Sequence, residues 1–260
     1  MVKYIDTHVH YYDEAFTSEE EADAAIGRSV EAGVVKMIQA DVGSAERDRM
    51  LRQTARYPGV LYHMLGLYPE SVGEGWEKEI EEICARLEDC SPVAIGEIGL
   101  DYHTTAENAS LQKLALREQL RIASQHDLPV NIHLRDATDD FFSVLDECRG
   151  LSLRGNLHAF SGSWETFCRL RGYGDWSVGI GGVVTFKNSH LPLAVEKIPL
   201  ECIVLETDTP YLSPTPYRGQ RNDSSRLPLV AAKIAEIKGL DLEEVAARTT
   251  ENATRLFSLK

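Results

Sequence analysis

Two histidines separated by one residue, His8 and His10, close a short apolar run near the start of the chain. Side chains two positions apart in a strand point to the same face, so both imidazoles would face one point, with Asp6 beneath them. Neutral imidazole is a common ligand of zinc, manganese and similar ions. The pair therefore predicts half of a metal site, although an isolated His-x-His is more often a pair of surface or capping histidines.

Four further candidate ligands follow other apolar runs: Glu97, His133, His158 and Asp208. Each of them alone has a structural explanation, such as a hydrogen-bonded core histidine or a buried acid paired to a base. Four histidines and two carboxylates gathered at one place would be strongly destabilising without a cation. Whether these six side chains lie close together therefore depends on the fold.

Eight apolar, β-rich runs recur along the 260 residues, and amphipathic helical patterns separate them. Short continuous apolar runs suit strands buried on both faces, and this alternation predicts an α/β fold, a (β/α)8 TIM-like barrel, as a single domain over residues 1–260. The predicted strands are 4–7, 34–40, 60–65, 93–95, 130–132, 155–157, 177–180 and 202–205. The predicted helices are 20–31, 45–57, 76–87, 110–126, 139–149, 164–171, 191–197, 227–238 and 242–256.

Catalytic groups of such barrels lie at the C-terminal ends of the strands. The first, fourth, fifth, sixth and eighth predicted strands each end at one of the candidate ligands, so five strand ends would bring them to one mouth. The eighth strand is followed by a long loop, 209–226, and a loop of this length in a compact domain is usually functional.

Composition restricts the classes of partner. The net charge of −14 argues against broad, non-specific binding of a nucleic-acid backbone, but it leaves room for a small basic rim around one pocket. No apolar run approaches the roughly 20 residues of a membrane span, so we expect no membrane association. The five cysteines form no C-x-x-C and we find no signal peptide, which predicts reduced thiols and a cytoplasmic location.

Several motifs in order along nearly the whole chain resemble the TatD family of metal-dependent hydrolases, within the amidohydrolase-like barrels. These motifs are Asp6-Thr7-His8-Val9-His10, Gly96-Glu97-Ile98-Gly99-Leu100-Asp101-Tyr102, Ile132-His133-Leu134-Arg135-Asp136, Leu157-His158-Ala159-Phe160-Ser161-Gly162-Ser163, Glu206-Thr207-Asp208-Thr209-Pro210-Tyr211-Leu212, Gly181-Gly182-Val183-Val184-Thr185-Phe186-Lys187, Arg218-Gly219-Gln220-Arg221-Asn222 and Thr249-Thr250-Glu251-Asn252-Ala253. The resemblance implies a deformed barrel, two divalent metal ions and hydrolysis of phosphodiester bonds, often as a DNase.

The resemblance also implies a role for each candidate ligand. One metal ion would be held by His8, His10 and Asp208, and the second by His133 and His158. Glu97 would bridge the two ions, which its two oxygens allow when the ions lie roughly 3.5–4 Å apart. Asp208 has a second expected role, as the general base that takes a proton from a metal-activated water. The chain would hold Zn, Mn, Mg, Ni or Co, although magnesium prefers oxygen ligands.

The sequence departs from the family after the third predicted strand. The family usually has Gly-x-His-Pro-His there, whereas this chain has Gly66-Leu67-Tyr68-Pro69-Glu70. A tyrosine hydroxyl can donate to a phosphate oxygen, but Glu70 would repel it. Substrate preference on that side of the pocket is therefore expected to differ from that of the nucleases.

The remaining expected substrate contacts are the cationic residues Arg135, Lys187, Arg218 and Arg221, because guanidinium groups bind phosphate in a bidentate manner. Surface ion pairing is the competing interpretation of each. We expect DNA or another phosphodiester as the substrate, cleaved by an exonuclease acting on single strands or ends. The same two-metal site would also suit an ester or amide hydrolase such as a deacylase, and a non-catalytic metal-bound scaffold is a third, less favoured, interpretation. The oligomeric state is not fixed by the sequence, and a monomer is compatible with it.

Overall fold

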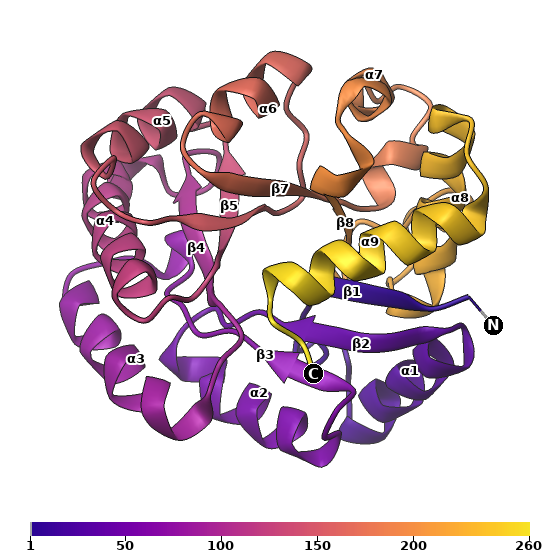
Figure 1. Ribbon diagram of the computed structural model, residues 1–260. Coiled ribbons are helices and arrows are strands. Elements are labelled where there is room, and N and C mark those ends of the chain that lie inside the picture. Colours follow the sequence, from indigo (N-terminus) through magenta and orange to yellow (C-terminus); the bar gives the residue numbers. More distant parts are fainter. Residues whose placement is uncertain (1) are drawn as a thin grey trace.

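Eight strands, all paired in parallel, alternate with helices in the computed structural model, which describes residues 2–260 (Figure 1). The strands are β1 (Tyr4–Val9), β2 (Val34–Gln39), β3 (Leu61–His63), β4 (Ile95–Asp101), β5 (Val130–Arg135), β6 (Arg154–Leu157), β7 (Asp175–Ile180) and β8 (Ile203–Leu205). The helices are α1 (Glu19–Glu31), α2 (Ser44–Arg56), α3 (Trp76–Cys90), α4 (Ala109–Gln125), α5 (Thr138–Glu147), α6 (Trp164–Arg171), α7 (Leu191–Lys197), α8 (Leu227–Lys238) and α9 (Leu242–Leu256). Short 3-10 turns are η1 (Pro69–Ser71), η2 (Ala106–Asn108), η3 (Gly182–Thr185), η4 (Leu200–Cys202) and η5 (Ser224–Arg226).

The strands form two sheets, in the orders β1-β2-β3 and β4-β5-β6-β7-β8. Single parallel bridges join these sheets at both seams, Leu65 with Ile95 and Val9 with Thr209. The sheets therefore close into one barrel with two weak seams, and the predicted deformed (β/α)8 barrel is confirmed. Helices α1 to α8 lie outside the strands (Figure 1).

The predicted helices all form, with ends that agree within three residues. Their ends follow local chemistry. Ser18 caps α1 by accepting a hydrogen bond from the Glu21 N–H, and acidic residues fill the first turn. Gly239, in the left-handed conformation, ends α8.

The fourth strand differs from its prediction. The predicted strand, 93–95, is too short. The observed β4 extends to Asp101, so Glu97 lies inside the strand. Glycines and polar residues conceal this strand in the sequence, but backbone pairing with β5, such as Ile98 with Ile132, does not depend on side-chain polarity. Gly99 has φ +148°, and a Cβ there would overlap the His133 carbonyl, so this close approach requires glycine.

Helix α9 crosses the barrel at the end where the strands begin (Figure 1). Asn252 donates hydrogen bonds to the carbonyls of Leu200 and Ile203, at the start of β8. Phe257, just after the helix, is buried in a cluster with Ile5 and Ile38. An apolar cluster thus fills much of this end of the barrel.

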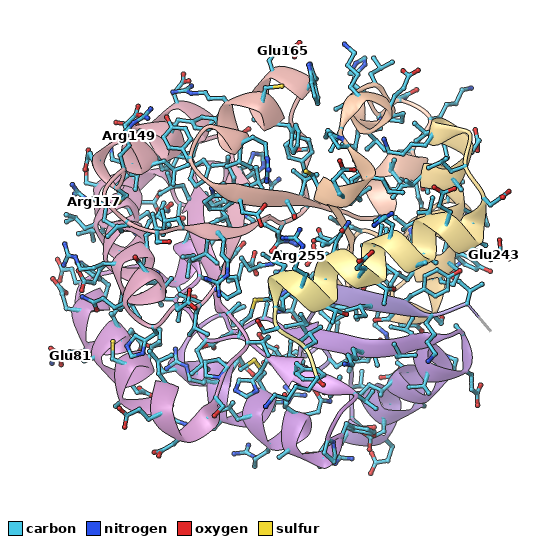
Figure 2. All side chains as sticks on the ribbon, in the orientation of Figure 1. Glu81, Arg117, Arg149, Glu165, Glu243 and Arg255 are labelled. Atoms are coloured by element: carbon cyan, nitrogen blue, oxygen red, sulfur yellow. The ribbon has the colours of Figure 1, made fainter. Side chains whose placement is uncertain are left out.

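Charged residues such as Glu81, Arg117, Arg149 and Glu165 project from the outer faces of the helices (Figure 2). No helix within residues 2–260 is both long enough and apolar enough to cross a membrane. The five cysteines are free thiols.

Candidate metal centre

The two histidines of β1 and its end point at the same place, as their spacing predicted. Their Nε2 atoms lie 3.0 Å apart, and both side chains are buried. His8 Nδ1 lies 3.0 Å from Asn131 Oδ1, while the Asn131 amide donates to Asn156 Oδ1. Asn131 therefore accepts the proton of His8 Nδ1, which leaves a lone pair on His8 Nε2 facing His10.

Glu97 lies between two pairs of histidines. Its Oε2 is 3.2 Å from His8 Nε2 and 3.7 Å from His10 Nε2. Its Oε1 is 2.9 Å from His133 Nδ1 and 3.7 Å from His158 Nε2. One oxygen thus faces each pair, which is the arrangement expected of a carboxylate that bridges two ions.

Asp208 reaches the same centre from the end of β8. Its Oδ1 lies 3.8 Å from His8 Nε2, 3.6 Å from His10 Nε2 and 3.9 Å from His158 Nε2. Asp208 has φ +58°, a left-handed conformation that non-glycine residues rarely adopt and that is concentrated at functional sites. The carboxylate therefore faces both pairs of histidines.

The six predicted ligands thus come together. They form three overlapping groups whose nitrogen and oxygen atoms lie within 4.8 Å of one another: His8, His10 and Glu97; Glu97, His133 and His158; and His8, His158 and Asp208. Nitrogen and carboxylate donors in this number suit divalent transition metals.

Two further carboxylates, which we did not single out from the sequence, lie behind the ligands. Asp101 Oδ2 is 2.9 Å from His133 Nε2, and Glu206 Oε1 is 3.0 Å from His158 Nδ1. Such partners orient an imidazole and make its other nitrogen a better ligand. Both carboxylates lie within the motifs that carry the family resemblance, so the sequence contained a signal for them. A Cβ at residue 179 would overlap the Glu206 side chain, so glycine at this position of β7 allows the close approach of Glu206.

Electrostatics shifts the pKa values of the two carboxyls and of two of the histidines in opposite directions. Burial opposes the charged form of Glu97 and Asp208, but the neighbouring imidazoles lower the pKa of both carboxyls below their usual values. Burial likewise opposes charge on His133 and His158. Asp101 and Glu97 nevertheless raise the pKa of His133 to about 9, and Glu206 leads the charges that raise that of His158 to about 10.

The four cationic residues expected to contact substrate lie in different surroundings. Arg135 and Lys187 are exposed, and among residues 2–260 neither side chain forms an ion pair. Arg218 stacks on Phe186, with its guanidinium carbon 4.2 Å from the ring centroid. These three side chains are available to an anion.

Arg221 binds the protein itself. Its guanidinium donates to the Ala15 carbonyl at 2.6 Å and to Glu21 at 2.5 Å. Tyr68 lies nearer the centre, since its ring is edge-on to His133 with centroids 5.0 Å apart. The Tyr68 hydroxyl donates to Glu70 Oε1 at 3.1 Å, which places an acid beside the His133 edge of the centre.

Comparison with known proteins identifies one family, whose members match nearly the whole chain. The model of the TatD related DNase family matches residues 5–258. The uncharacterized metal-dependent hydrolase YabD of Bacillus subtilis is 35% identical over 255 residues, covering 98% of each chain. The crystal structure of YjjV, a TatD homologue of Escherichia coli, has a TM-score of 0.88 and 30% identity, covering 99% of this chain and 98% of that one. A TatD family hydrolase of Entamoeba histolytica has a TM-score of 0.83 at 22% identity, covering 98% of each, and shares the fold.

Proposed function

The chain belongs to the TatD-related DNase family of metal-dependent hydrolases, and from that premise we propose that it cleaves phosphodiester bonds, with DNA as the substrate, at a centre of two divalent metal ions. The DNA would be attacked at single strands or ends. The observation that supports this most directly is the convergence of lone pairs on one point. His8 Nε2 has no proton to donate when its ring is neutral, yet it lies 3.0 Å from His10 Nε2 and 3.2 Å from Glu97 Oε2. Such a contact between acceptors is repulsive unless a cation or a proton lies among them.

The donor set fits two ions rather than one. Glu97 directs separate oxygens at His8 and His133, on opposite sides of its carboxylate. We therefore assign His8, His10 and Asp208 to one ion, His133 and His158 to the other, and Glu97 to both. Zinc, manganese, cobalt and nickel suit these mixed ligands better than magnesium. When bound, such ions would lower the pKa of a water molecule and neutralise charge on a phosphate.

The protein's own residues would supply proton transfer and substrate binding. Asp208 would accept the proton of the attacking water, since its pKa lies below the usual range and the carboxylate is ionised at neutral pH. Arg135, Lys187 and Arg218 would bind neighbouring phosphates, because their cationic groups are free of carboxylates. Arg221, which is already paired with Glu21, would contribute less than these three.

A second candidate function is hydrolysis of an uncharged ester or amide, and the pair of Tyr68 and Glu70 favours it. Burial and then the charges of Glu97 and Glu70 raise the pKa of Tyr68, so its hydroxyl stays protonated and donates to Glu70. A carboxylate at this edge would repel a second phosphate but not a neutral group.

A direct test compares bis-p-nitrophenyl phosphate and single-stranded DNA with p-nitrophenyl acetate, using protein loaded with manganese or zinc. We expect the phosphodiesters to be cleaved, the activity to disappear with a chelator, and the metal content to approach two equivalents. Glu97→Ala should lose more metal than His133→Ala, because Glu97 would hold both ions and His133 only one. Full activity without metal, or hydrolysis of the acetate alone, would overturn the proposal.

A further inference from the structure

His10 can bind a metal ion through Nε2 only if the proton of its neutral ring lies on the other nitrogen, Nδ1. Nothing in the spacing of His8 and His10 determines this choice. The structure determines it through the group that Nδ1 meets. His10 Nδ1 lies 3.2 Å from the hydroxyl oxygen of Tyr12, two residues further along the chain.

The direction of this hydrogen bond follows from the second partner of the hydroxyl. Tyr12 also donates to the main-chain carbonyl of Ala40. A carbonyl oxygen can only accept, and a phenol has one hydrogen, so that hydrogen is already used. The Tyr12 oxygen therefore has only lone pairs to offer to His10. The contact forms when His10 Nδ1 carries the proton and donates it.

Tyr12 and its acceptor Ala40 are both held in place by the barrel. Tyr12 is 3% exposed, and its ring meets that of His10 at 68° with centroids 5.8 Å apart. Ala40 follows β2, and its N–H donates to the Val9 carbonyl at 3.0 Å. The pairing of β1 with β2 thus fixes the carbonyl that orients the hydroxyl, and the hydroxyl fixes the imidazole.

We propose that Tyr12 is a positioning residue for metal binding, which holds His10 in the tautomer with hydrogen on Nδ1 and a lone pair on Nε2. This inference rests on the metal centre of the proposed function. Without the hydroxyl, the His10 ring either buries an unsatisfied Nδ1–H or moves its proton to Nε2. A proton on Nε2 would point at His8 and occupy the position of the ion.

The chain offers a matched control in the preceding residue. Tyr11 is also fully buried, and its hydroxyl contacts Ser29 and Ser224 at 2.9 Å each, with no histidine in contact. Tyr11→Phe and Tyr12→Phe each remove one buried hydroxyl and keep the ring. They differ in whether that hydroxyl supports a predicted ligand.

The experiment measures zinc affinity of the purified, full-length protein by competition with a chromophoric chelator. We expect Tyr12→Phe to weaken binding of at least one zinc ion by about 10–100-fold, the range found when such supporting hydrogen bonds are removed. Tyr11→Phe should bind zinc within about twofold of wild type, given that range. Circular dichroism would establish that both variants are folded. Equal losses in the two variants, or wild-type affinity in Tyr12→Phe, would overturn the proposal.

A second measurement does not depend on any variant. Long-range 1H–15N spectra of the zinc-loaded wild type should show His10 protonated at Nδ1 and unprotonated at Nε2. A proton on Nε2 of His10 would refute the inference even if Tyr12→Phe fails to fold. The protein could also bind zinc with the expected tautomer and yet hydrolyse no phosphodiester. That result would contradict the proposed function and support this inference.

Discussion

The two carboxylates of the centre differ in their access to solvent. The Glu97 side chain is 4% exposed and is surrounded by histidines, whereas that of Asp208 is 16% exposed. A general base must pass its proton on after each turnover, which requires a path to water. In the proposed function, Glu97 would therefore hold the two ions together, and Asp208 would move a proton.

Replacing Asp208 by asparagine separates the two roles of this residue. The amide oxygen can still coordinate a metal, but an amide cannot accept a proton at neutral pH. Asparagine also tolerates the left-handed conformation at φ +58°, so the backbone conformation at residue 208 should not change. We expect Asp208→Asn to retain most of its metal and to lose about 10²–10⁴-fold in kcat, with little change in KM.

Steady-state kinetics combined with elemental analysis would check this expectation. Activity within about threefold of wild type, with metal retained, would mean that another group is the base, since general-base assistance contributes far more than that. Loss of metal in proportion to activity would leave Asp208 as a ligand alone.

At the scale of elements, the long loop after β8 is tied to the segment that carries Asp208. The side-chain amide of Asn222 donates to the carbonyls of Thr207 at 3.0 Å and Tyr211 at 2.8 Å. These carbonyls flank Asp208, and Asn222 itself is 1% exposed. The loop therefore acts as a brace for Asp208, a proposed ligand, and Arg221 secures the loop to Glu21.

Asn222→Ala should loosen this brace. Removing the amide leaves two carbonyls without a partner, and an unsatisfied buried polar group costs about 1–3 kcal/mol. We expect the free energy of unfolding to fall by about 2 kcal/mol and metal to be bound less tightly. Chemical denaturation and zinc titration would measure both effects. Gln220→Ala, at an exposed position of the same loop, should stay within about 0.5 kcal/mol of wild type. Equal behaviour of the two variants would contradict the brace.

At the scale of the whole molecule, we expect metal uptake to be linked to the release of protons. In the metal-free protein the pKa of His133 is about 9 and that of His158 about 10, against about 6.5 in the unfolded chain. Because these pKa values are raised on folding, their stabilising contribution is complete below pH 6.5 and is lost as pH rises through 9 and 10. An ion that binds either imidazole must displace its proton, so acid opposes binding.

We therefore expect stabilisation by manganese to grow as pH rises from 6.5 to 9. Each displaced proton weakens binding by about 1.4 kcal/mol for every pH unit below its pKa. The increase in melting temperature on adding manganese, measured at several pH values in the same protein, should rise by several degrees across this range. A constant increase would show that His133 and His158 are not protonated in the metal-free protein, or that they do not bind the ion.

Much of the fold and the ligand set was predictable from the sequence alone. Apolar runs and amphipathic repeats reflect burial directly, so the order of strands and helices was predictable, with element ends only approximate. The six ligands stood out because polar groups at the ends of buried strands need a functional or structural partner. The family motifs then implied how His8, Glu97 and Asp208 are grouped.

Other features required the tertiary structure, because they depend on contacts between residues far apart in sequence. The extension of β4 through Glu97 rests on backbone pairing with β5, which leaves no apolar pattern. The tautomer of His10 depends on the carbonyl of Ala40, just after β2, and the engagement of Arg221 depends on a carboxylate of α1. A sequence lists the groups that can donate and accept, but only the folded chain pairs each donor with its acceptor.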